Sequence, residues 1–433
     1  MKDYKADWLE PRAAAERVVG SVDCLPSERS PLLAARGRVL AEAITSRIDL
    51  PRWTNSAMDG FAVRSADIIG ASRENPAVLE VLEDVPAGSF PTRPLTTGKA
   101  TRVMTGAPVP DGADTVIRVE HTDGGANPGT FEASVAIFDA HDSGKNLRRR
   151  GEDIRAGATA LPAGSLLTPA AIGVAASLGY GNVAVFRRPL VALLTSGDEL
   201  VELEEFQQVL EGRKIVSSNS YTLAAQLAEG GCEVRYLGIA RDTPQSLAET
   251  LEGARGCDAL ITSAGISVGE HDYVKEVLLS FGADAAFWRV RMRPGSPFAF
   301  GRIAAFGGIP WFGLPGNPVS SMVTFELFAR PALLRMAGRS RVYRRPIAAT
   351  LLEDHNTLTG LTQFVRVRLD QDEEGRVVAR VTGPQGSGIL TSVALAEGLM
   401  IVPPDAGRLQ AGQPVSVIPL ESSPAGFAEA PPF

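Results

Sequence analysis

Three loops of small and acidic residues follow predicted strands, and their composition could hold a charged ligand. They are LTSGDEL at 194–200, ITSAGISVGEHDY at 261–273 and GLPGNPVSS at 313–321. Backbone N–H groups in such loops, beside a helix N-terminus, stabilise a phosphate or an oxyanion without a cation. One loop alone is weak support, because Gly and Ser are also common there for turn geometry. Three loops at one edge of one sheet predict an anion-binding site.

Three carboxylates, Glu199, Asp242 and Asp272, each lie just past a predicted strand. Helix capping is the competing interpretation, and for Asp242 the two are evenly balanced. The functional interpretation is a magnesium site, because Mg²⁺ prefers a few carboxylates completed by water and substrate phosphates. Apart from His271, which we expect to be exposed, no imidazole or thiol lies near them in the sequence.

Two further segments carry positive charge that suits an anion. RRRGEDIRAG at 148–157 follows Lys145 and holds three consecutive arginines. A charge run is usually a solvated face, but in an acidic protein this one slightly favours an anion contact. RMRPGSPFAFG at 291–301 places Arg291 and Arg293 on a short Pro-Gly loop after a predicted strand.

The stretch TNSAMDGFA at 54–62 raises a separate question about Asp59. Asp-Gly is a strong turn signal, yet the residues before it are small and neutral, which is unusual for an exposed tip. Asp59 is therefore either a turn residue or a carboxylate presented to a substrate.

The composition of the chain excludes several classes of protein. The chain has 433 residues, 44% of them hydrophobic and 21% charged, which predicts a soluble protein of three or four domains. No apolar run reaches the roughly 20 residues of a membrane span, and the charged N-terminus does not resemble a signal peptide. Three scattered cysteines predict a reducing cytoplasm with no disulfide framework and no structural zinc. The net charge of -7 argues against a nucleic-acid surface.

The order of elements predicts several domains. Residues 7 to 46 have the spacing of two helices, the second starting near Ser30-Pro31, and 53–145 has the alternating runs of a β-rich module. A helix with Thr168 as N-cap and Gly179 as its stop follows, so the β-rich module is inserted into a helical domain. Strands and helices alternate over 189–338, which predicts an α/β domain with a mostly parallel sheet that binds ligands at its carboxyl edge. Strands return after Tyr343 as a small β domain.

In this order and at this spacing, the motifs resemble one family. PRWTNSAMDGFAVRSAD, TRVMTGAPVPDGADTVIRVE, RRRGEDIRAG, LTSGDEL, ITSAGISVGEHDYVKEVL and GLPGNPVSS together resemble the molybdopterin molybdenumtransferase family (MoeA / gephyrin E-domain), from about residue 10 to 420. The resemblance implies a multidomain α/β plus β fold. Its parts would be a helical dimerisation domain (1–52 with 146–186), an inserted β-rich lid (53–145), a molybdopterin-binding three-layer α/β domain (187–340), a C-terminal β-barrel-like domain (341–421) and a disordered tail (422–433).

The same resemblance implies the reaction and its partners. A cytoplasmic homodimer, with an active cleft shared between protomers, would use molybdate and Mg²⁺ to convert adenylylated molybdopterin to molybdenum cofactor and AMP. The substrate's own dithiolene sulfurs would ligate molybdenum, so scattered Cys and His residues are no objection. Transient contact with the molybdopterin adenylyltransferase or with molybdoenzyme apoproteins is also implied, and no nucleic acid or membrane.

Site residues carry over motif by motif. The catalytic set would be Asp59, Thr105, Asp153, Glu199, Asp242 and Asp272, with Asp242, Asp272 and Glu199 as magnesium ligands. Substrate contacts would be Ser196, Gly197, Ser218, Asn219, Ser263, Gly265, Ser267, Pro315, Gly316, Asn317 and Pro318. Molybdate contacts would be Arg293, Ser296, Pro297, Arg366 and Ser387.

Two departures from the family pattern stand out. Residues 293–297 read Arg-Pro-Gly-Ser-Pro where Lys-Pro-Gly-Lys-Pro is frequent, which keeps one positive charge and loses another. Ala264 stands where a second glycine is common, and a positive φ there would strain alanine by roughly 1 kcal/mol or more. These departures leave open a molybdopterin-binding scaffold without insertase activity. A molybdopterin adenylyltransferase is disfavoured by the lid and the β domain, and tungstate in place of molybdate is not separable by sequence.

Overall fold

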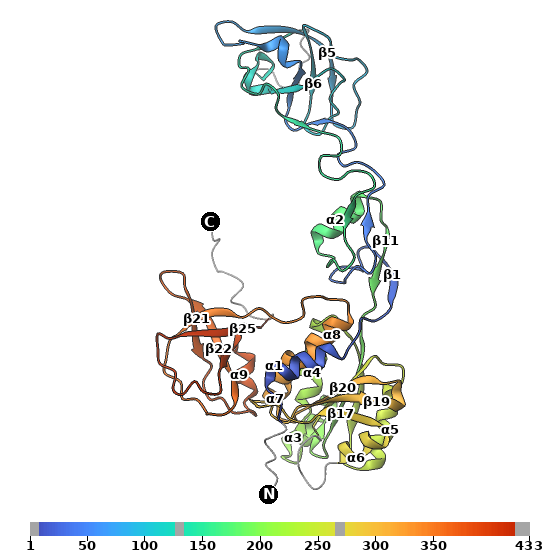
Figure 1. The fold of residues 1–433 in the computed structure, drawn as a ribbon, viewed down its shortest axis with the longest axis vertical. Helices are drawn as coiled ribbons and strands as arrows, with labels where there is room; N and C mark the ends of the chain where they lie inside the picture. Colours follow the sequence, from blue (N-terminus) through green and yellow to red (C-terminus); the bar gives the residue numbers. More distant parts are fainter. Residues whose placement is uncertain (1–7, 126–133, 265–272, 421–433) are drawn as a thin grey trace. The chain divides into compact units, whose positions relative to one another are not determined.

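The computed structural model describes residues 8–125, 134–264 and 273–420. The chain divides into two compact units, one of 1–41, 166–168 and 182–433 and the other of 42–165 and 169–181. Each unit is described by itself (Figure 1). Within the described residues, no helix has the length and apolar character needed to cross a bilayer.

The first unit is built around a six-stranded, mostly parallel sheet, as the alternation of elements predicted. Its strand order is β15-β12-β16-β20-β19-β17, in which β19 runs antiparallel to its two neighbours and the other five strands run in one direction. The bounds are β12 Leu190–Ser196, β15 Glu233–Ala240, β16 Ala259–Ser263, β17 Ala283–Phe287, β19 Ala299–Ile303 and β20 Ile309–Leu314.

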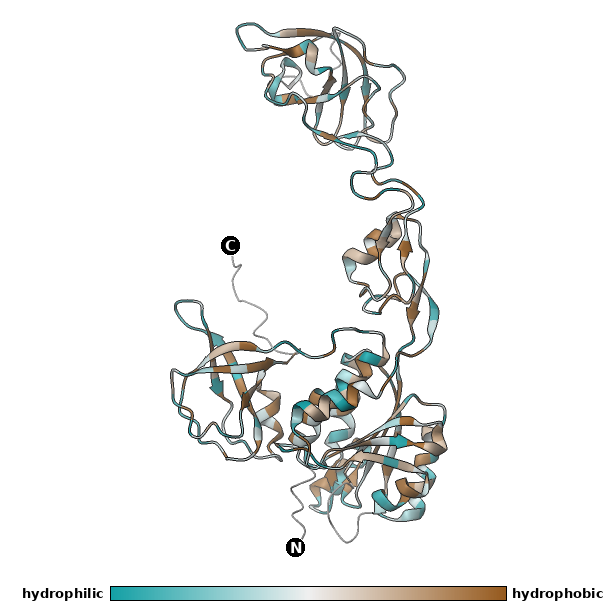
Figure 2. Cartoon of the chain, in the orientation of Figure 1, coloured by the Kyte–Doolittle hydropathy of each residue, from teal (hydrophilic) through white to brown (hydrophobic). Residues whose placement is uncertain are grey.

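Helices cover both faces of this sheet, which gives three layers. On one face pack α1 (Pro11–Gly20), α4 (Ser218–Glu229), α7 (Pro318–Thr324) and α8 (Arg330–Met336), and on the other α5 (Pro244–Leu251) and α6 (Tyr273–Ser280). Along β12, Val191 and Leu193 join the first core, and Ala192 and Leu194 join the second. A strand buried on both faces needs the continuous apolar run that VALL supplies. In Figure 2 the helices carry hydrophobic and hydrophilic colouring together, as helices with one face on a sheet do.

The C-terminal strands close into a small barrel, as the resemblance implied. The order β22-β23-β21-β25-β24 returns to β22, and β18 adds to β22 in parallel. Alternate residues of β22, Val365, Val367 and Leu369, point into its core. The bounds are β18 Met292–Arg293, β21 Ile347–Leu351, β22 Thr362–Gln371, β23 Val377–Val381, α9 Leu390–Ala394, β24 Gly398–Val402 and β25 Pro414–Pro419.

The prediction of a second helix before residue 46 is wrong. Residues Ser27–Pro31 form β1, which pairs antiparallel with β11 (Asn182–Phe186). Leu33, an apolar residue within the segment predicted to be this helix, is 82% exposed. The backbone hydrogen bonds of this segment go to a strand about 150 residues away, and such long-range pairing overrides local spacing. The first unit is completed by β13 (Leu200–Val201), β14 (Ile215–Val216) and α3 (Phe206–Leu210).

The second unit is β-rich, as the alternating apolar and polar runs over 53–145 predicted. Its main sheet has the order β7-β4-β6-β5-β8, and two short ladders pair β3 with β9 and β2 with β10. Helix α2 (Pro169–Ser177) begins and ends where Pro169 and Gly179 predicted, with Gly179 at φ 82°. The bounds are β2 Ile44–Thr45, β3 Asn55–Ser56, β4 Gly60–Val63, β5 Ala77–Val85, β6 Lys99–Val103, β7 Thr115–Arg118, β8 Ser134–Ile137, β9 Leu147–Arg148 and β10 Thr159–Leu161. The predicted domain boundaries stay predictions, because this division into units does not test them.

Candidate functional site

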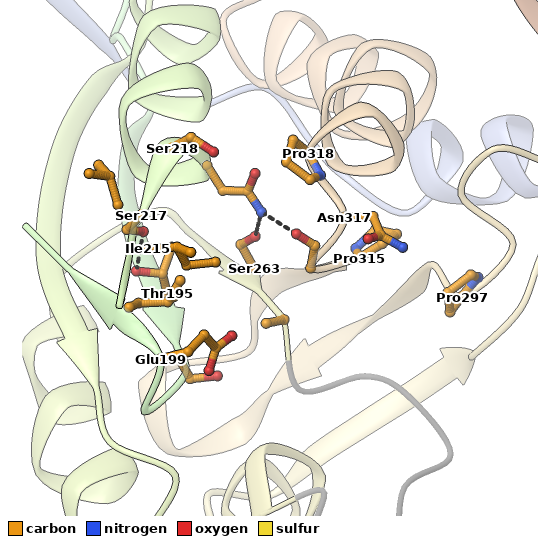
Figure 3. Close-up of a pocket in the computed structure, with 16 residues that line it drawn as sticks. Thr195, Glu199, Ile215, Ser217, Ser218, Ser263, Pro297, Pro315, Asn317 and Pro318 are labelled. Atoms are coloured by element: carbon orange, nitrogen blue, oxygen red, sulfur yellow. Dashed lines mark hydrogen bonds between the residues drawn. The ribbon is translucent and has the colours of Figure 1, made fainter. Parts of the chain in front are cut away.

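A pocket of about 470 Å³ opens at the carboxyl edge of the α/β sheet (Figure 3). Its walls come from the ends of β12, β16 and β20 and from the starts of α4 and α7. The structure therefore brings the loops at 194–200 and 313–321 together with Ser263 and Ala264, the described start of the third loop, as their common edge requires. The lining residues are Thr195, Ser196, Glu199, Leu200, Ile215, Val216, Ser217, Ser218, Asn219, Ser263, Ala264, Pro297, Pro315, Gly316, Asn317 and Pro318.

Eight of the predicted substrate contacts lie in this lining. Gly197 lines a neighbouring cavity, and Gly265 and Ser267 lie outside the described residues. The eight are Ser196, Ser218, Asn219, Ser263, Pro315, Gly316, Asn317 and Pro318. Their roles toward a substrate stay predictions.

Asn219 ties the three walls together. Its Nδ2 donates to Ser263 Oγ and to the carbonyl of Gly316, each at 2.8 Å. The start of α4 is thereby fixed to the ends of β16 and β20 (Figure 3). Among the described residues no donor reaches its Oδ1, although this atom is buried. A ligand donor in the pocket could satisfy it.

Ala264 has a positive φ, which is the backbone conformation in which strain was predicted for alanine. Its φ is 79°, in the left-handed region where a Cβ is unfavourable. A Cβ placed on Gly316 would lie 3.3 Å from the Ala264 Cβ, so the two loops approach closely. The pocket wall is therefore strained at Ala264, and glycine at that position would relieve the strain.

The carboxylates gather in part beside this pocket. Glu199 lines it. The Asp242 and Asp198 carboxylates each accept a hydrogen bond from the other residue's backbone N–H, at 3.3 Å. Burial raises the pKa of Asp242, and the charges of Asp198 and Glu199 raise it further. Capping does not explain Asp242, because Thr243 is the N-cap of α5 and accepts from Ser246 N.

The predicted magnesium ligands do not by themselves complete a metal site. Within the described chain no group of three or more His, Cys, Asp or Glu side chains is placed to hold a metal, and Asp272 lies outside the described residues. Glu199 and Asp242 nevertheless supply hard oxygen donors. The pKa of Asp242 is raised first by burial and then by the charges of Asp198 and Glu199, and a cation would neutralise the local negative charge. This donor set fits Mg²⁺ held mainly by water and substrate phosphates.

Two predicted molybdate contacts, Arg293 and Arg366, line a second cavity of about 200 Å³. Arg366 is 1% exposed and donates to Ser392 Oγ at 3.1 Å and to the Gly386 carbonyl at 3.0 Å. Burial and, to a smaller extent, the charge of Arg293 together lower the pKa of Arg366 to about 10. No carboxylate of the described residues forms an ion pair with either guanidinium. Two cations that line one cavity without counter-charge are a composition that suits an anion, and their role toward molybdate stays a prediction.

The segment 293–297 joins the two cavities. Arg293 and Pro294 line the arginine cavity, and Pro297 lines the main pocket. Ser296 Oγ between them is buried and has no partner within the described part of the chain. Ser387 lies outside both linings and acts through its backbone, because its carbonyl accepts from Val319 N of α7 at 3.1 Å.

In the second unit, Asp59 and Thr105 hold each other. Asp59 Oδ1 accepts from the Thr105 backbone N–H at 2.6 Å and from its hydroxyl at 2.8 Å. These two bonds lower the pKa of Asp59. Asp153 is exposed in the same unit, and Arg150 of the basic run pairs with Asp49 at 2.6 Å. Arg150 is therefore part of a surface ion pair, and the anion contact expected of the basic run stays a prediction.

Almost the whole chain is similar to known proteins of one family. Three family models match in the order of the domains: the MoeA N-terminal region (domains I and II) at 9–179, a probable molybdopterin binding domain at 192–335 and the MoeA C-terminal region (domain IV) at 348–420. Molybdopterin molybdenumtransferase 2 of Mycobacterium tuberculosis is 39% identical over 393 residues, 89% of this chain and 93% of that protein. This chain belongs to the molybdopterin molybdenumtransferase (MoeA) family.

Other relatives of the MoeA family agree over the full length. A molybdopterin molybdenumtransferase of Staphylococcus aureus is 33% identical over 97% of this chain and 98% of its own. The crystal structure of the molybdopterin biosynthesis MoeA protein of Pyrococcus horikoshii matches with a TM-score of 0.80 at 29% identity, over 95% of this chain and all of that one. The fold that the resemblance implied is therefore the fold of the family.

Sequence reasoning did not select some of the residues that line the main pocket. Ser217, Ile215 and Val216 come from β14 and the turn before α4, a segment that the strand-end argument passed over. The run SSNS at 217–220, just before a helical pattern, was the available signal.

Proposed function

We propose that this chain inserts molybdenum, supplied as molybdate, into adenylylated molybdopterin and releases AMP as molybdenum cofactor forms. The observation that carries the proposal is the segment 293–297, which lines two cavities of different chemistry. The main pocket has small polar side chains and two helix N-termini, which suit phosphates. The second has two uncompensated arginines, which suit a tetrahedral dianion.

The chemistry of each side chain suggests a different role in the reaction. Ser218, Asn219 and Asn317 would bind and orient the substrate at the starts of α4 and α7. Arg293 and Arg366 would hold the oxyanion beside it. Family membership adds Asp59 and Thr105 of the lid as functional groups, and their mutual hydrogen bonds would orient the Asp59 carboxylate.

Magnesium is part of the proposal as a cofactor. Glu199 and Asp242 would hold it together with the substrate phosphates, and the bound ion would neutralise charge that develops on the phosphate oxygens. Asp242 would be held in place by the backbone N–H of Asp198. A cytoplasmic homodimer, in which the lid of one protomer completes the cleft of the other, is also proposed on family grounds, as are transient contacts with the adenylyltransferase and with molybdoenzyme apoproteins.

The experiment is AMP release from purified protein and adenylylated molybdopterin, with and without molybdate and Mg²⁺. Release that needs both ions is the expected result. Tight binding of substrate without release under any oxyanion would instead favour a scaffold, and the loss of the second lysine at Ser296 would be the place to look. Parallel reactions with tungstate would define the oxyanion preference.

A further inference from the structure

A chain of hydrogen bonds leads from the main pocket to a carboxylate outside it. Ser217 and Thr195 line the pocket and are each 1% exposed. Ser217 Oγ lies 2.6 Å from Ser220 Oγ, which lies 3.0 Å from the phenol oxygen of Tyr236. Tyr236 donates to Glu202 Oε1 at 2.6 Å. Glu202 lines a separate cavity of about 320 Å³, so the chain connects two cavities through the protein.

The carboxylate at the end of this chain fixes its direction. An ionised carboxylate accepts hydrogen bonds and donates none, so the single phenol proton of Tyr236 is committed to Glu202. Burial and the bond to Glu202 raise the pKa of Tyr236 to about 12, so the phenol keeps its proton at neutral pH. The Tyr236 oxygen must then accept from Ser220, and Ser220, with its proton spent, must accept from Ser217.

The consequence appears at the pocket wall. Ser217 is left with its proton directed away from the pocket, and its oxygen lone pairs remain available. Thr195 is in the same position, because its hydroxyl lies 3.2 Å from Ser220 Oγ and must donate to it, since the Ser220 proton is directed to Tyr236. The single proton of Ser217 is directed to Ser220, so the 3.3 Å contact between Ser217 and Thr195 joins two oxygens whose lone pairs remain available. Figure 3 draws the contact between Thr195 and Ser217. Asn219 Oδ1, buried without a partner among the described residues, adds a third acceptor to this wall.

We propose that Glu202, acting through Tyr236 and Ser220, sets the hydrogen-bond polarity of this wall, so that it accepts from N–H donors of the ligand and selects for them. Glu202 and Tyr236 are positioning residues, because neither lines the main pocket. The inference rests on the proposed function for the identity of the ligand. Adenylylated molybdopterin offers such donors at both ends, as the exocyclic amino group of its pterin and that of its adenine.

The test uses two pairs of probes that differ only in that amino group. One pair is AMP and purine riboside 5′-monophosphate, and the other is neopterin and its 2-deamino analogue. Dissociation constants are measured by calorimetry for the wild-type full-length chain and for Glu202→Leu and Tyr236→Phe. The matched control is Tyr221→Phe, which removes a longer hydrogen bond to the same carboxylate, at 3.4 Å, outside the chain.

The wild type is expected to favour the amino member of one pair about tenfold or more, because a site built to pair with a donor leaves buried acceptors unsatisfied when the donor is missing. The pair that discriminates identifies which end of the substrate the wall binds. In Glu202→Leu, which leaves Tyr236 without this acceptor, and in Tyr236→Phe the preference is expected to fall to about threefold or less. A purely structural role for Glu202 would weaken both members of a pair equally and leave their ratio unchanged.

Several results would overturn the proposal. Equal affinity for both members of both pairs, a preference retained in both variants, or no binding of any probe would each do so. The failure is distinct from failure of the proposed function, because AMP release from adenylylated molybdopterin would then persist while the discrimination is absent. A loss of preference in Tyr221→Phe equal to that in Tyr236→Phe would also contradict the assigned path.

Discussion

Replacing Arg366 by methionine tests the oxyanion cavity most directly, because the structure allows the energetic terms to be weighed. A pKa of about 10, against the ordinary value of 12.5, corresponds to about 3 kcal/mol of unfavourable free energy for the charged side chain in the folded state. Methionine removes this term. It also removes the hydrogen bonds to Ser392 and Gly386, worth about 1.5 kcal/mol each for a charged donor.

These terms nearly cancel, so Arg366→Met is expected to change the free energy of unfolding by less than about 1.5 kcal/mol at pH 7. That is unusual for a fully buried arginine, because removing one partner of a buried ion pair costs about 3–5 kcal/mol. The sign with pH follows from the lowered pKa. The unfavourable term is fully present at neutral pH, and wild-type stability rises with pH between about 10 and 12.5, where only the unfolded chain keeps the proton. The variant lacks this rise.

The function of Arg366 appears when the oxyanion is added. Molybdate at 100 times its dissociation constant is expected to stabilise the wild type by about 2.7 kcal/mol and to leave Arg366→Met unchanged. Calorimetric unfolding with and without molybdate, at matched ionic strength, measures both quantities. Arg368→Met, an exposed arginine two residues along β22, is the control. Destabilisation of Arg366→Met by more than about 3 kcal/mol, or undiminished stabilisation by molybdate, would refute the reasoning.

Three further predictions follow from single contacts. Ala264→Gly is expected to stabilise the chain by about 1 kcal/mol in denaturant titration, because φ 79° costs alanine but not glycine, and a loss of stability would contradict the strain. Asp59→Asn keeps an acceptor for Thr105, so the free energy of unfolding of the lid is expected to change by less than about 1 kcal/mol while AMP release falls at least about tenfold. Full turnover with an intact lid would make Asp59 only a turn residue. Asp242→Asn removes a carboxylate whose raised pKa makes its charge unfavourable above the pH where it ionises. The variant is therefore expected to be at least as stable as the wild type at pH 7 but to lose magnesium-dependent AMP release, and unchanged turnover would exclude Asp242 as a ligand.

Outside residues 27–46, the sequence by itself determined most of the local elements and their order. VALLT at 191–195 had to be a strand buried on both faces, because an unbroken apolar run of that length buries both faces of a parallel sheet. Glycine at 179 ended α2 and the three loops fell at one edge, because turn chemistry and the rule for parallel strands depend on few residues at a time. The sequence also allowed the prediction that Ala264 would be strained if its φ were positive, before that φ was known.

Only the tertiary structure decided which distant residues meet. Ser27–Pro31 became a strand because β11 was there to pair with it, and Thr243 rather than Asp242 took the cap of α5. Arg293 and Arg366 share a cavity because β18 adds to β22 of the barrel. The path from Ser217 to Glu202 joins side chains from separate elements. A hydrogen bond is sensitive to distances of tenths of an ångström, and local sequence patterns carry no information on that scale between elements far apart in the chain.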